Sequence, residues 1–270
     1  MHLTPWILAL SLFLTNCASL AAPLSPEPIE TSAAVEAQLV TRQVLDGQEG
    51  EIHYSYYLPE GYSEANAYPM MVVMPGYGRM WFGENSAGRN VEWNGFQTWL
   101  DRGMIVVSAQ LTDWHEKSAC QAVELTEYMI ENFRVDTSRV YAAGYSAGGE
   151  TMSQAVSLRP DLYAAYIHGA SQWDGTYAPA AENQVAVYIF MAENDEYYGS
   201  QKARTAYDGL LFAYQEAGVS DEEIEKLLQI QIPDNAWFNQ RGIYNYYRDG
   251  SVLFDEEEIL EWVLNQEKHQ

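Results

Sequence analysis

Short apolar runs alternate with amphipathic stretches along most of the chain. Residues 51–59 alternate between apolar and polar side chains, which predicts a half-buried antiparallel strand. Unbroken apolar runs, typical of buried strands, follow at 70–76, 104–110, 139–146, 164–170 and 185–192. Helical patterns are predicted at 91–100, 118–133, 147–158, 200–217 and 255–266. This alternation predicts an α/β fold, with a mostly parallel sheet covered by helices on both faces.

The N-terminal segment has the pattern of an export signal. The apolar run at 6–14 is too short to span a bilayer, and small residues follow it as far as Ala22. The chain thus divides into a predicted signal peptide, a proline-rich linker and a single domain, at 1–22, 23–38 and 39–270. No transmembrane segment is predicted, and the expected location is secreted or extracellular. A lipid anchor on Cys17 is the alternative, because residues 14–17 resemble a lipoprotein box.

Composition and charge narrow the classes of partner. Apolar residues make up 47% and aromatic residues 13% of the 270, which excludes a disordered chain. With 14 basic and 38 acidic residues, the formal net charge is −24. A surface this acidic repels phosphate backbones and anionic membranes, so we expect no nucleic-acid partner. The oligomeric state is left open.

The cysteines and histidines indicate no metal site. The five histidines are scattered, and neither Cys-x-x-Cys nor His-x-x-x-His spacing occurs. Only Cys120 remains once a signal peptide is removed, so an internal disulfide is excluded. We therefore expect neither a metal nor a cofactor.

The segment Gly144-Tyr145-Ser146-Ala147-Gly148 carries the strongest chemical signal. It follows a predicted strand and precedes a predicted helix, which is the context of a nucleophile elbow. Its glycines permit a strained turn that exposes the serine hydroxyl. The helix N-terminus then offers the backbone N–H of Ala147 to a developing oxyanion.

Four stretches of the chain, this motif among them, resemble a known group of enzymes. They are residues 56–78, 136–171, 185–199 and 259–266. The resemblance is to secreted bacterial esterases of the α/β-hydrolase superfamily, near the feruloyl-esterase, polyhydroxybutyrate-depolymerase and prolyl-oligopeptidase-like branch. It implies an eight-stranded sheet and a catalytic Ser, Asp and His in that chain order.

Two further site residues are expected at the ends of strands. Asp195 closes the apolar run at 185–192 and lies at the same edge as the elbow, where a carboxylate can orient an imidazole. The second oxyanion donor is expected in the loop after the strand at 70–76. There we choose the backbone N–H of Tyr77, within Pro-Gly-Tyr-Gly.

The catalytic base is where the chain departs from the pattern. The loop before the last helix contains no histidine, and Tyr247 and Arg248 occupy the expected position. Arginine stays charged at ordinary pH and tyrosine is a poor base near neutrality. His115, in a loop at the same edge, is the candidate substitute base. His168 is interpreted as a hydrogen-bonded residue at a strand end.

Aromatic residues on the loops after the strands suggest a binding surface. Trp81, Trp114 and Trp173 are the expected substrate-binding residues, since their rings suit sugar, aryl or acyl groups. Two functions stay open. The first is an exported serine hydrolase that cleaves a neutral small-molecule or carbohydrate-linked ester and is impaired by the lost histidine. The second is a non-catalytic binding protein with the same fold.

Overall fold

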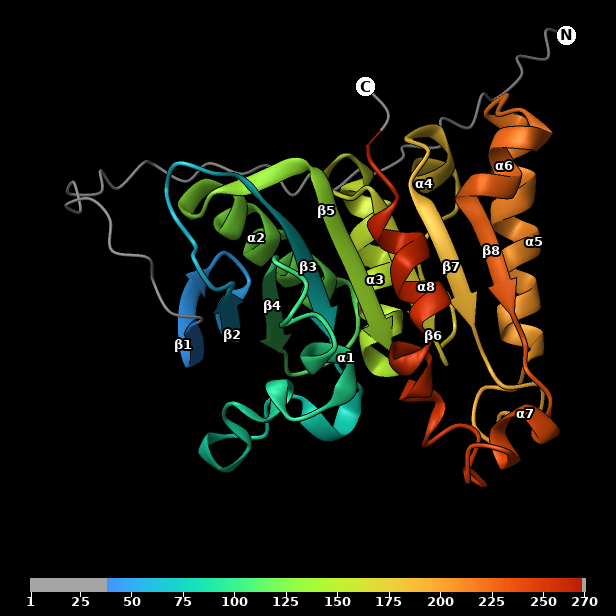
Figure 1. Ribbon diagram of the computed structural model, residues 1–270, viewed down its shortest axis with the longest axis horizontal. Coiled ribbons are helices and arrows are strands. Elements are labelled where there is room, and N and C mark those ends of the chain that lie inside the picture. The colour runs from blue at the N-terminus through green and yellow to red at the C-terminus, as the bar shows by residue number, and fades with distance from the viewer. Residues whose placement is uncertain (1–37, 269–270) are drawn as a thin grey trace, which may run out of the picture.

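The computed structural model describes residues 38–268, and Figure 1 shows their arrangement. The predicted signal peptide and nearly all of the linker lie outside these residues, as does the Cys17 alternative. The strands are β1 (Gln38–Gly47), β2 (Gly50–Leu58), β3 (Tyr68–Met74), β4 (Ile105–Gln110), β5 (Val135–Tyr145), β6 (Ala165–Gly169), β7 (Ala186–Phe190) and β8 (Leu228–Gln231). They form one sheet in the order β1-β2-β4-β3-β5-β6-β7-β8.

The sheet is mostly parallel, as the alternating pattern predicts. Only β2 runs against its neighbours, β1 on one side and β4 on the other. All other pairs, from β4–β3 to β7–β8, are parallel. The carboxyl ends of these parallel strands therefore share one edge, where ligands bind in open α/β sheets.

Helices cover both faces of the sheet. The first layer contains α2 (Glu116–Asn132), α3 (Ala147–Leu158), α4 (Ala178–Glu182) and α5 (Gln201–Glu216), which contact one another in succession. On the opposite face lie α1 (Asn94–Gln97), the 3₁₀ helix η5 (Gly250–Asp255) and α8 (Glu257–Leu264), and Figure 1 shows α8 in front of the sheet. Two short helices, α6 (Asp221–Leu227) and α7 (Asn235–Asn239), flank β8.

The central strands form the core, and this is why they appear as unbroken apolar runs. Every residue of β4, β6 and β7 is buried, including the polar Ser108 and His168. Strands covered on both faces lose the alternation of a half-exposed strand. In β2, by contrast, buried and half-buried positions intermingle, in line with its predicted half-buried character.

Two predicted helices differ in the structure. Residues 91–100 contain only α1 and the end of a 3₁₀ turn at Arg89–Val91. Trp93 is extended there and covers Gly95, whose Cβ would lie 2.5 Å from the indole ring. The predicted helix at 255–266 begins later, because the 3₁₀ helix η5 ends at Asp255. No helix within residues 38–268 is long and apolar enough to cross a membrane.

Candidate active site

Ser146 lies on the sharp turn between β5 and α3. Its backbone has φ 56° and ψ −125°, a strained conformation for a residue with a side chain, and the residue is 4% exposed. The flanking glycines make this turn sterically possible. A Cβ on Gly144 would lie 2.5 Å from the Gly148 carbonyl oxygen, and one on Gly148 would lie 2.1 Å from that of Met74. The predicted strand–turn–helix context is therefore present.

The expected oxyanion donors flank the serine on two segments. Ala147 is the first residue of α3, so its backbone N–H has no acceptor within the helix. The loop after β3 passes beside the serine, because a Cβ on Gly76 would be 3.3 Å from that of Ser146. Tyr77 follows, and this residue is 57% exposed. Both segments thus lie beside Ser146, and the role of their N–H groups as oxyanion donors stays a prediction.

Asp195 follows β7 at the same edge and is 7% exposed. Its Oδ1 accepts the backbone N–H groups of Tyr197 (2.9 Å), Tyr198 (2.6 Å) and Gly199 (3.2 Å). Its Oδ2 is buried and has no hydrogen-bond partner among residues 38–268. In a Ser-His-Asp triad the second oxygen would accept the imidazole N–H. The acceptor is retained here, and no histidine reaches it within the described part of the chain.

Tyr247 occupies the expected position of the base. Its Oη lies 2.6 Å from Ser146 Oγ, and its ring stacks on Tyr197 with centroids 4.8 Å apart. Burial, together with the charges of Tyr197, Asp195 and Glu150, raises the pKa of the Tyr247 phenol, which the Ser146 hydroxyl only partly opposes. Tyr247 is therefore a neutral phenol at ordinary pH.

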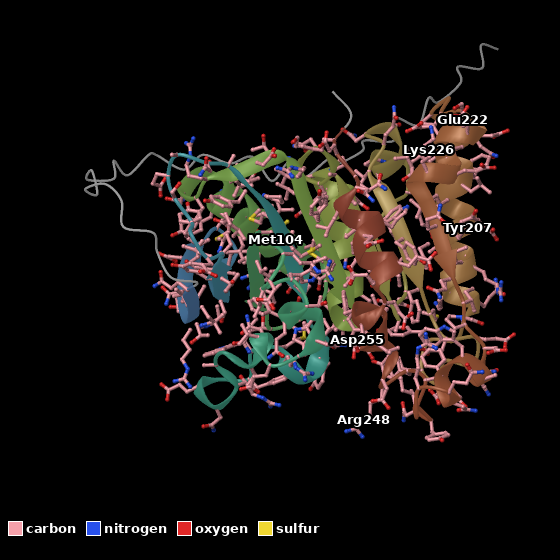
Figure 2. All side chains as sticks on the ribbon, viewed as in Figure 1. Met104, Tyr207, Glu222, Lys226, Arg248 and Asp255 are labelled. Atoms are coloured by element: carbon pink, nitrogen blue, oxygen red, sulfur yellow. The ribbon has the colours of Figure 1, made fainter. Side chains whose placement is uncertain are left out.

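The loop that carries Tyr247 is fixed by hydrogen bonds to its backbone. Glu196 accepts the N–H of Tyr246 (3.1 Å) and of Tyr247 (2.7 Å), and the Tyr145 hydroxyl donates to the Tyr247 carbonyl. Of the two positions considered for the base, only Tyr247 reaches the serine. Arg248 is exposed, and Figure 2 shows its side chain directed away from the ribbon. The structure therefore favours Tyr247 over Arg248 as the residue that faces Ser146.

A second tyrosine faces the serine from the loop after β7. Tyr198 Oη donates to Glu150 Oε1 at 2.6 Å, and the Ser146 hydroxyl interacts with the same phenol. Glu150 lies on the first turn of α3 and is 5% exposed. Sequence reasoning did not predict this contact between Tyr198 and Glu150. The available signal was an acidic residue four positions after the serine, which a helix directs to the same side as its start.

The two histidines considered are not bonded to the serine. His115 is an exposed residue at the N-terminus of α2, where its backbone N–H donates to Asp113 Oδ1 and its ring packs against Trp114. Within residues 38–268, no hydrogen bond joins it to Ser146, so the structure places Tyr247 and not His115 at the hydroxyl.

His168 is buried and uses both ring nitrogens. Its Nε2 donates to the Ser171 carbonyl at 3.2 Å, and its Nδ1 lies 2.7 Å from the Tyr166 hydroxyl. Burial lowers the pKa of His168 to about 4, so the ring is neutral. Ser171 Oγ in turn donates to the Ser146 carbonyl at 2.7 Å, which links this interior histidine to the elbow.

The three predicted substrate-binding tryptophans have different surroundings. Trp81 stacks on His53 with centroids 3.6 Å apart, and Trp114 meets the ring of Tyr77 at 6.0 Å. Trp173 packs against Tyr166, His168 and Tyr177, and its Nε1 is buried without a partner among the described residues. Trp173 therefore fills the interior of its loop, and only Trp114 belongs to the aromatic group that includes Tyr77.

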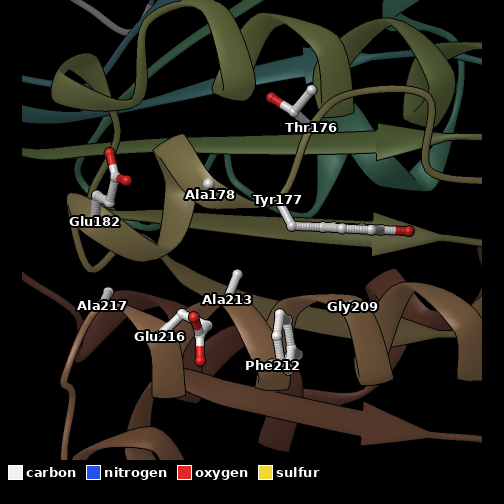
Figure 3. A pocket seen from close by; sticks show the side chains of 9 residues that line it. All are labelled: Thr176, Tyr177, Ala178, Glu182, Gly209, Phe212, Ala213, Glu216 and Ala217. Carbon is white, nitrogen blue, oxygen red and sulfur yellow. The ribbon is translucent and has the colours of Figure 1, made fainter.

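Two pockets lie away from the serine. One is a groove of about 390 Å³ between α4 and α5, lined by Tyr177 and Phe212 among others, and Figure 3 shows these side chains facing each other across it. The other, of about 290 Å³, lies near Asp161 and Lys268. Neither includes Ser146. Within residues 38–268, no group of three or more acidic, histidine or cysteine side chains is placed to hold a metal.

The comparisons with known proteins agree with this geometry. Residues 107–216 match the prolyl oligopeptidase family, a segment that includes Ser146 and Asp195 but ends before Tyr247. No curated protein sequence matches the chain. A thermostable esterase structure superposes with a TM-score of 0.71 at 18% identity, covering 85% of this chain and 63% of that one. The chain has the α/β-hydrolase fold.

Other solved structures that superpose on the chain differ widely in length. The feruloyl esterase module from Clostridium thermocellum, complexed with sinapinate, has a TM-score of 0.58 at 12% identity and covers 90% of this chain and 99% of its own. Oligopeptidase B from Leishmania major has a TM-score of 0.57 at 13% identity, and the chain spans 37% of its length. At identities of 12 to 18%, these likenesses concern the fold.

Proposed function

We propose that this chain is an exported serine hydrolase that cleaves a neutral carboxylic ester through an acyl-enzyme on Ser146. The observation that carries the proposal is the strained backbone of Ser146, at φ 56°, on a turn whose glycines admit no Cβ. Such strain persists where the surrounding structure and the chemistry require it. In support of the proposal, Ser146 lies beside the N-terminus of α3 and the Gly76 loop, whose backbone N–H groups would stabilise an oxyanion.

The surroundings of the serine support a neutral substrate with an aromatic or sugar-like part. Tyr77 and Phe82 are more than half exposed on one side of the site, and Tyr197 is 69% exposed on the other. Their rings offer flat apolar surfaces for aryl, sugar or acyl groups. The net charge of −24 disfavours anionic substrates. The feruloyl esterase module that shares the fold is complexed with sinapinate, an aromatic acid.

Ester hydrolysis with a matched pair of serine variants tests the proposal. We expect wild-type protein and Ser63→Ala, a substitution in the loop before β3, to cleave an activated aryl acetate at the same rate. Ser146→Ala should cleave it no faster than buffer. A fluorophosphonate probe should add its mass to the peptide that contains Ser146. Equal rates for wild type and Ser146→Ala would refute the proposal, as would an adduct only at another serine.

A non-catalytic binding protein is the second candidate, and one observation favours it. Tyr247 replaces the expected histidine, and Asp195 Oδ2 is left without a partner among residues 38–268. Under this alternative, aryl esters would raise the melting temperature without being hydrolysed. Ser146→Ala would then keep the full thermal shift, whereas a hydrolase would convert the ester during the measurement.

Export is supported by the N-terminal pattern alone. Mass spectrometry of the protein secreted by its host should find a mature chain that begins after Ala21 or Ala22. A lipid-modified N-terminus at Cys17 would favour the anchored alternative instead.

A further inference from the structure

The proposed hydrolase needs a proton acceptor for Ser146. Within residues 38–268, no carboxylate accepts a hydrogen bond from the Tyr247 hydroxyl, so Tyr247 cannot pass a proton on. Building on the proposed function, we propose that Tyr198 and Glu150 form a proton relay for this serine. The Tyr198 hydroxyl receives the proton of Ser146 and passes its own proton to the Glu150 carboxylate. The relay takes the place of the missing histidine.

A hydrogen bond joins Tyr198 to Glu150, and the hydroxyl of Ser146 lies near the Tyr198 phenol. Tyr198 Oη donates to Glu150 Oε1 at 2.6 Å, a short bond of the charge-assisted kind. The same phenol interacts with the Ser146 hydroxyl. A phenol has one proton, so once Tyr198 donates to Glu150 its oxygen is the acceptor that faces Ser146. In the proposed relay the serine proton is directed to Tyr198. Tyr247 then acts as the donor in its 2.6 Å contact with Ser146 Oγ, a contact in which either oxygen can donate.

Both members of the relay are held in place. Asp195 Oδ1 accepts the backbone N–H of Tyr198 at 2.6 Å and so fixes the loop that presents its ring. The ring also packs edge-on against Tyr197 and Tyr247, with centroids 4.7 and 5.7 Å away. Glu150 is fixed by α3 and is 5% exposed. The carboxylate that would orient an imidazole in a triad thus orients a tyrosine.

The surroundings of Glu150 suit a base that works near neutral pH. Burial raises its pKa above the ordinary glutamate value, the charge of Asp174 adds to this rise, and the Tyr198 hydrogen bond, His115 and Lys202 oppose it. The other titratable groups that face it are Tyr166 and Tyr247. A carboxylate with a raised pKa accepts a proton more readily than an exposed one. Burial and the bond to Glu150 also raise the pKa of Tyr198, which keeps it a neutral proton carrier.

The chemical steps balance without any other reactant than ester and water. Ser146 Oγ attacks the ester carbonyl carbon, its proton moves to Tyr198, and the Tyr198 proton moves to Glu150, while the carbonyl electron pair forms the oxyanion. When the intermediate collapses, the ester C–O bond breaks and the leaving alkoxide takes a proton from Tyr198, which Glu150 replaces. Water then attacks the acyl-enzyme by the same route, releasing the acid and restoring Ser146.

The test compares two conservative variants with matched controls. Glu150→Gln and Tyr198→Phe break the relay at its two ends, and the controls are Glu193→Gln and Tyr244→Phe, at exposed positions. For each protein, the rate of fluorophosphonate addition to Ser146 and the kcat for an activated aryl ester are measured from pH 4 to 10. These rates require the serine proton to leave, so they report the relay directly.

We expect the wild-type rates to rise through one ionisation between the ordinary glutamate pKa and neutrality, and then to stay level. Each relay variant should lower the level rate by on the order of 10²- to 10⁴-fold. Glu150→Gln should also remove the ionisation, and the controls should match wild type. Thermal unfolding controls for folding. Burial raises the pKa of Glu150 in the folded state, so protonation of this carboxyl stabilises the fold at low pH, and that stabilisation is lost as pH rises through the folded-state pKa. At pH 7 we therefore expect Glu150→Gln to be at least as stable as wild type.

The outcomes separate the relay from the proposed function. Serine-dependent hydrolysis that both relay variants retain would overturn the relay and leave the hydrolase standing. A wild-type rate that keeps rising above pH 9 would assign the proton to a Tyr247 phenolate and also overturn it. No reaction of Ser146 with probe or ester in the wild type would overturn both.

Discussion

The elbow at Ser146 and the loop that carries Tyr247 are held in place by different interactions. At the elbow, backbone atoms approach so closely that the residue types are fixed, as Gly148 shows with its 2.1 Å approach to the Met74 carbonyl oxygen. The loop with Tyr247 is held instead by hydrogen bonds to its own backbone, from Glu196 and Tyr145. Such bonds do not specify the side chain at 247. A site can therefore lose its histidine while the loop keeps its position.

The largest expected effect is at the elbow. Gly148→Ala places a Cβ against the backbone of β3, which neither segment can relieve without breaking the turn. We expect it to lower the free energy of unfolding by about 4 kcal/mol or more, a loss typical of severe steric conflict in a core. Urea denaturation measures the change. Gly78→Ala is the control, because a Cβ there meets no atom within 4 Å, and an equal loss in both would contradict the steric argument.

The interior of the elbow should make stability depend on pH. Because burial lowers the pKa of His168 to about 4, the unfolded chain binds its proton more readily than the folded chain. Stability should then fall as pH drops from about 6.5 towards 4, by roughly 3 kcal/mol for this group. Unfolding curves at several pH values measure the slope. His168→Gln should flatten it, and an unchanged slope would show that another group titrates there.

The loop that carries Tyr247 should accept a histidine at that position, whereas the glycines of the elbow accept no larger side chain. In the Glu150→Gln background, where the proposed relay is broken, Tyr247→His offers an imidazole to Ser146 and to the unpartnered Asp195 Oδ2. We expect ester hydrolysis to rise on the order of 10²-fold, with an ionisation near pH 6 to 7. Arg248→His, whose side chain would point away from the site, should give no gain. A gain from Arg248→His alone would show that the loop rearranges.

The smallest expected effect concerns the hydrogen bonds that hold the loop of Tyr247 in place. Glu196 is partly desolvated, but the N–H groups of Tyr247 and Tyr246 bond to its charged form and lower its pKa. The stability that the charged Glu196 carboxylate contributes is present above its unfolded-state pKa and is lost as pH falls through its folded-state pKa. Glu196→Gln should therefore speed proteolysis of residues 240–250 severalfold at neutral pH, with little change in global unfolding. Proteolysis as slow as in wild type would assign the loop's position to packing alone.

The sequence predicts the buried strands and the elbow because both depend on local pattern. Unbroken apolar runs identify β3 to β7, and the glycines around Ser146 identify the turn. The polar edge strand β1 and the four-residue β8 were missed, since neither has a distinctive period. The loop of Tyr247 was expected beside the serine, whereas the contacts of Tyr198 with Glu150 and with the serine were missed. They join segments far apart in the chain, and no residue spacing encodes such a meeting.

The unpartnered oxygen of Asp195 has a consequence for how the site can change. A tyrosine codon becomes a histidine codon by a single T-to-C transition at its first base. At position 247 that one transition would place an imidazole beside Asp195, whose Oδ2 has no hydrogen-bond partner among residues 38–268. The loop that carries residue 247 and the elbow would not need to change. The genes for the tyrosine and histidine forms of this site therefore differ by one nucleotide, and selection for faster ester cleavage would require only that one change.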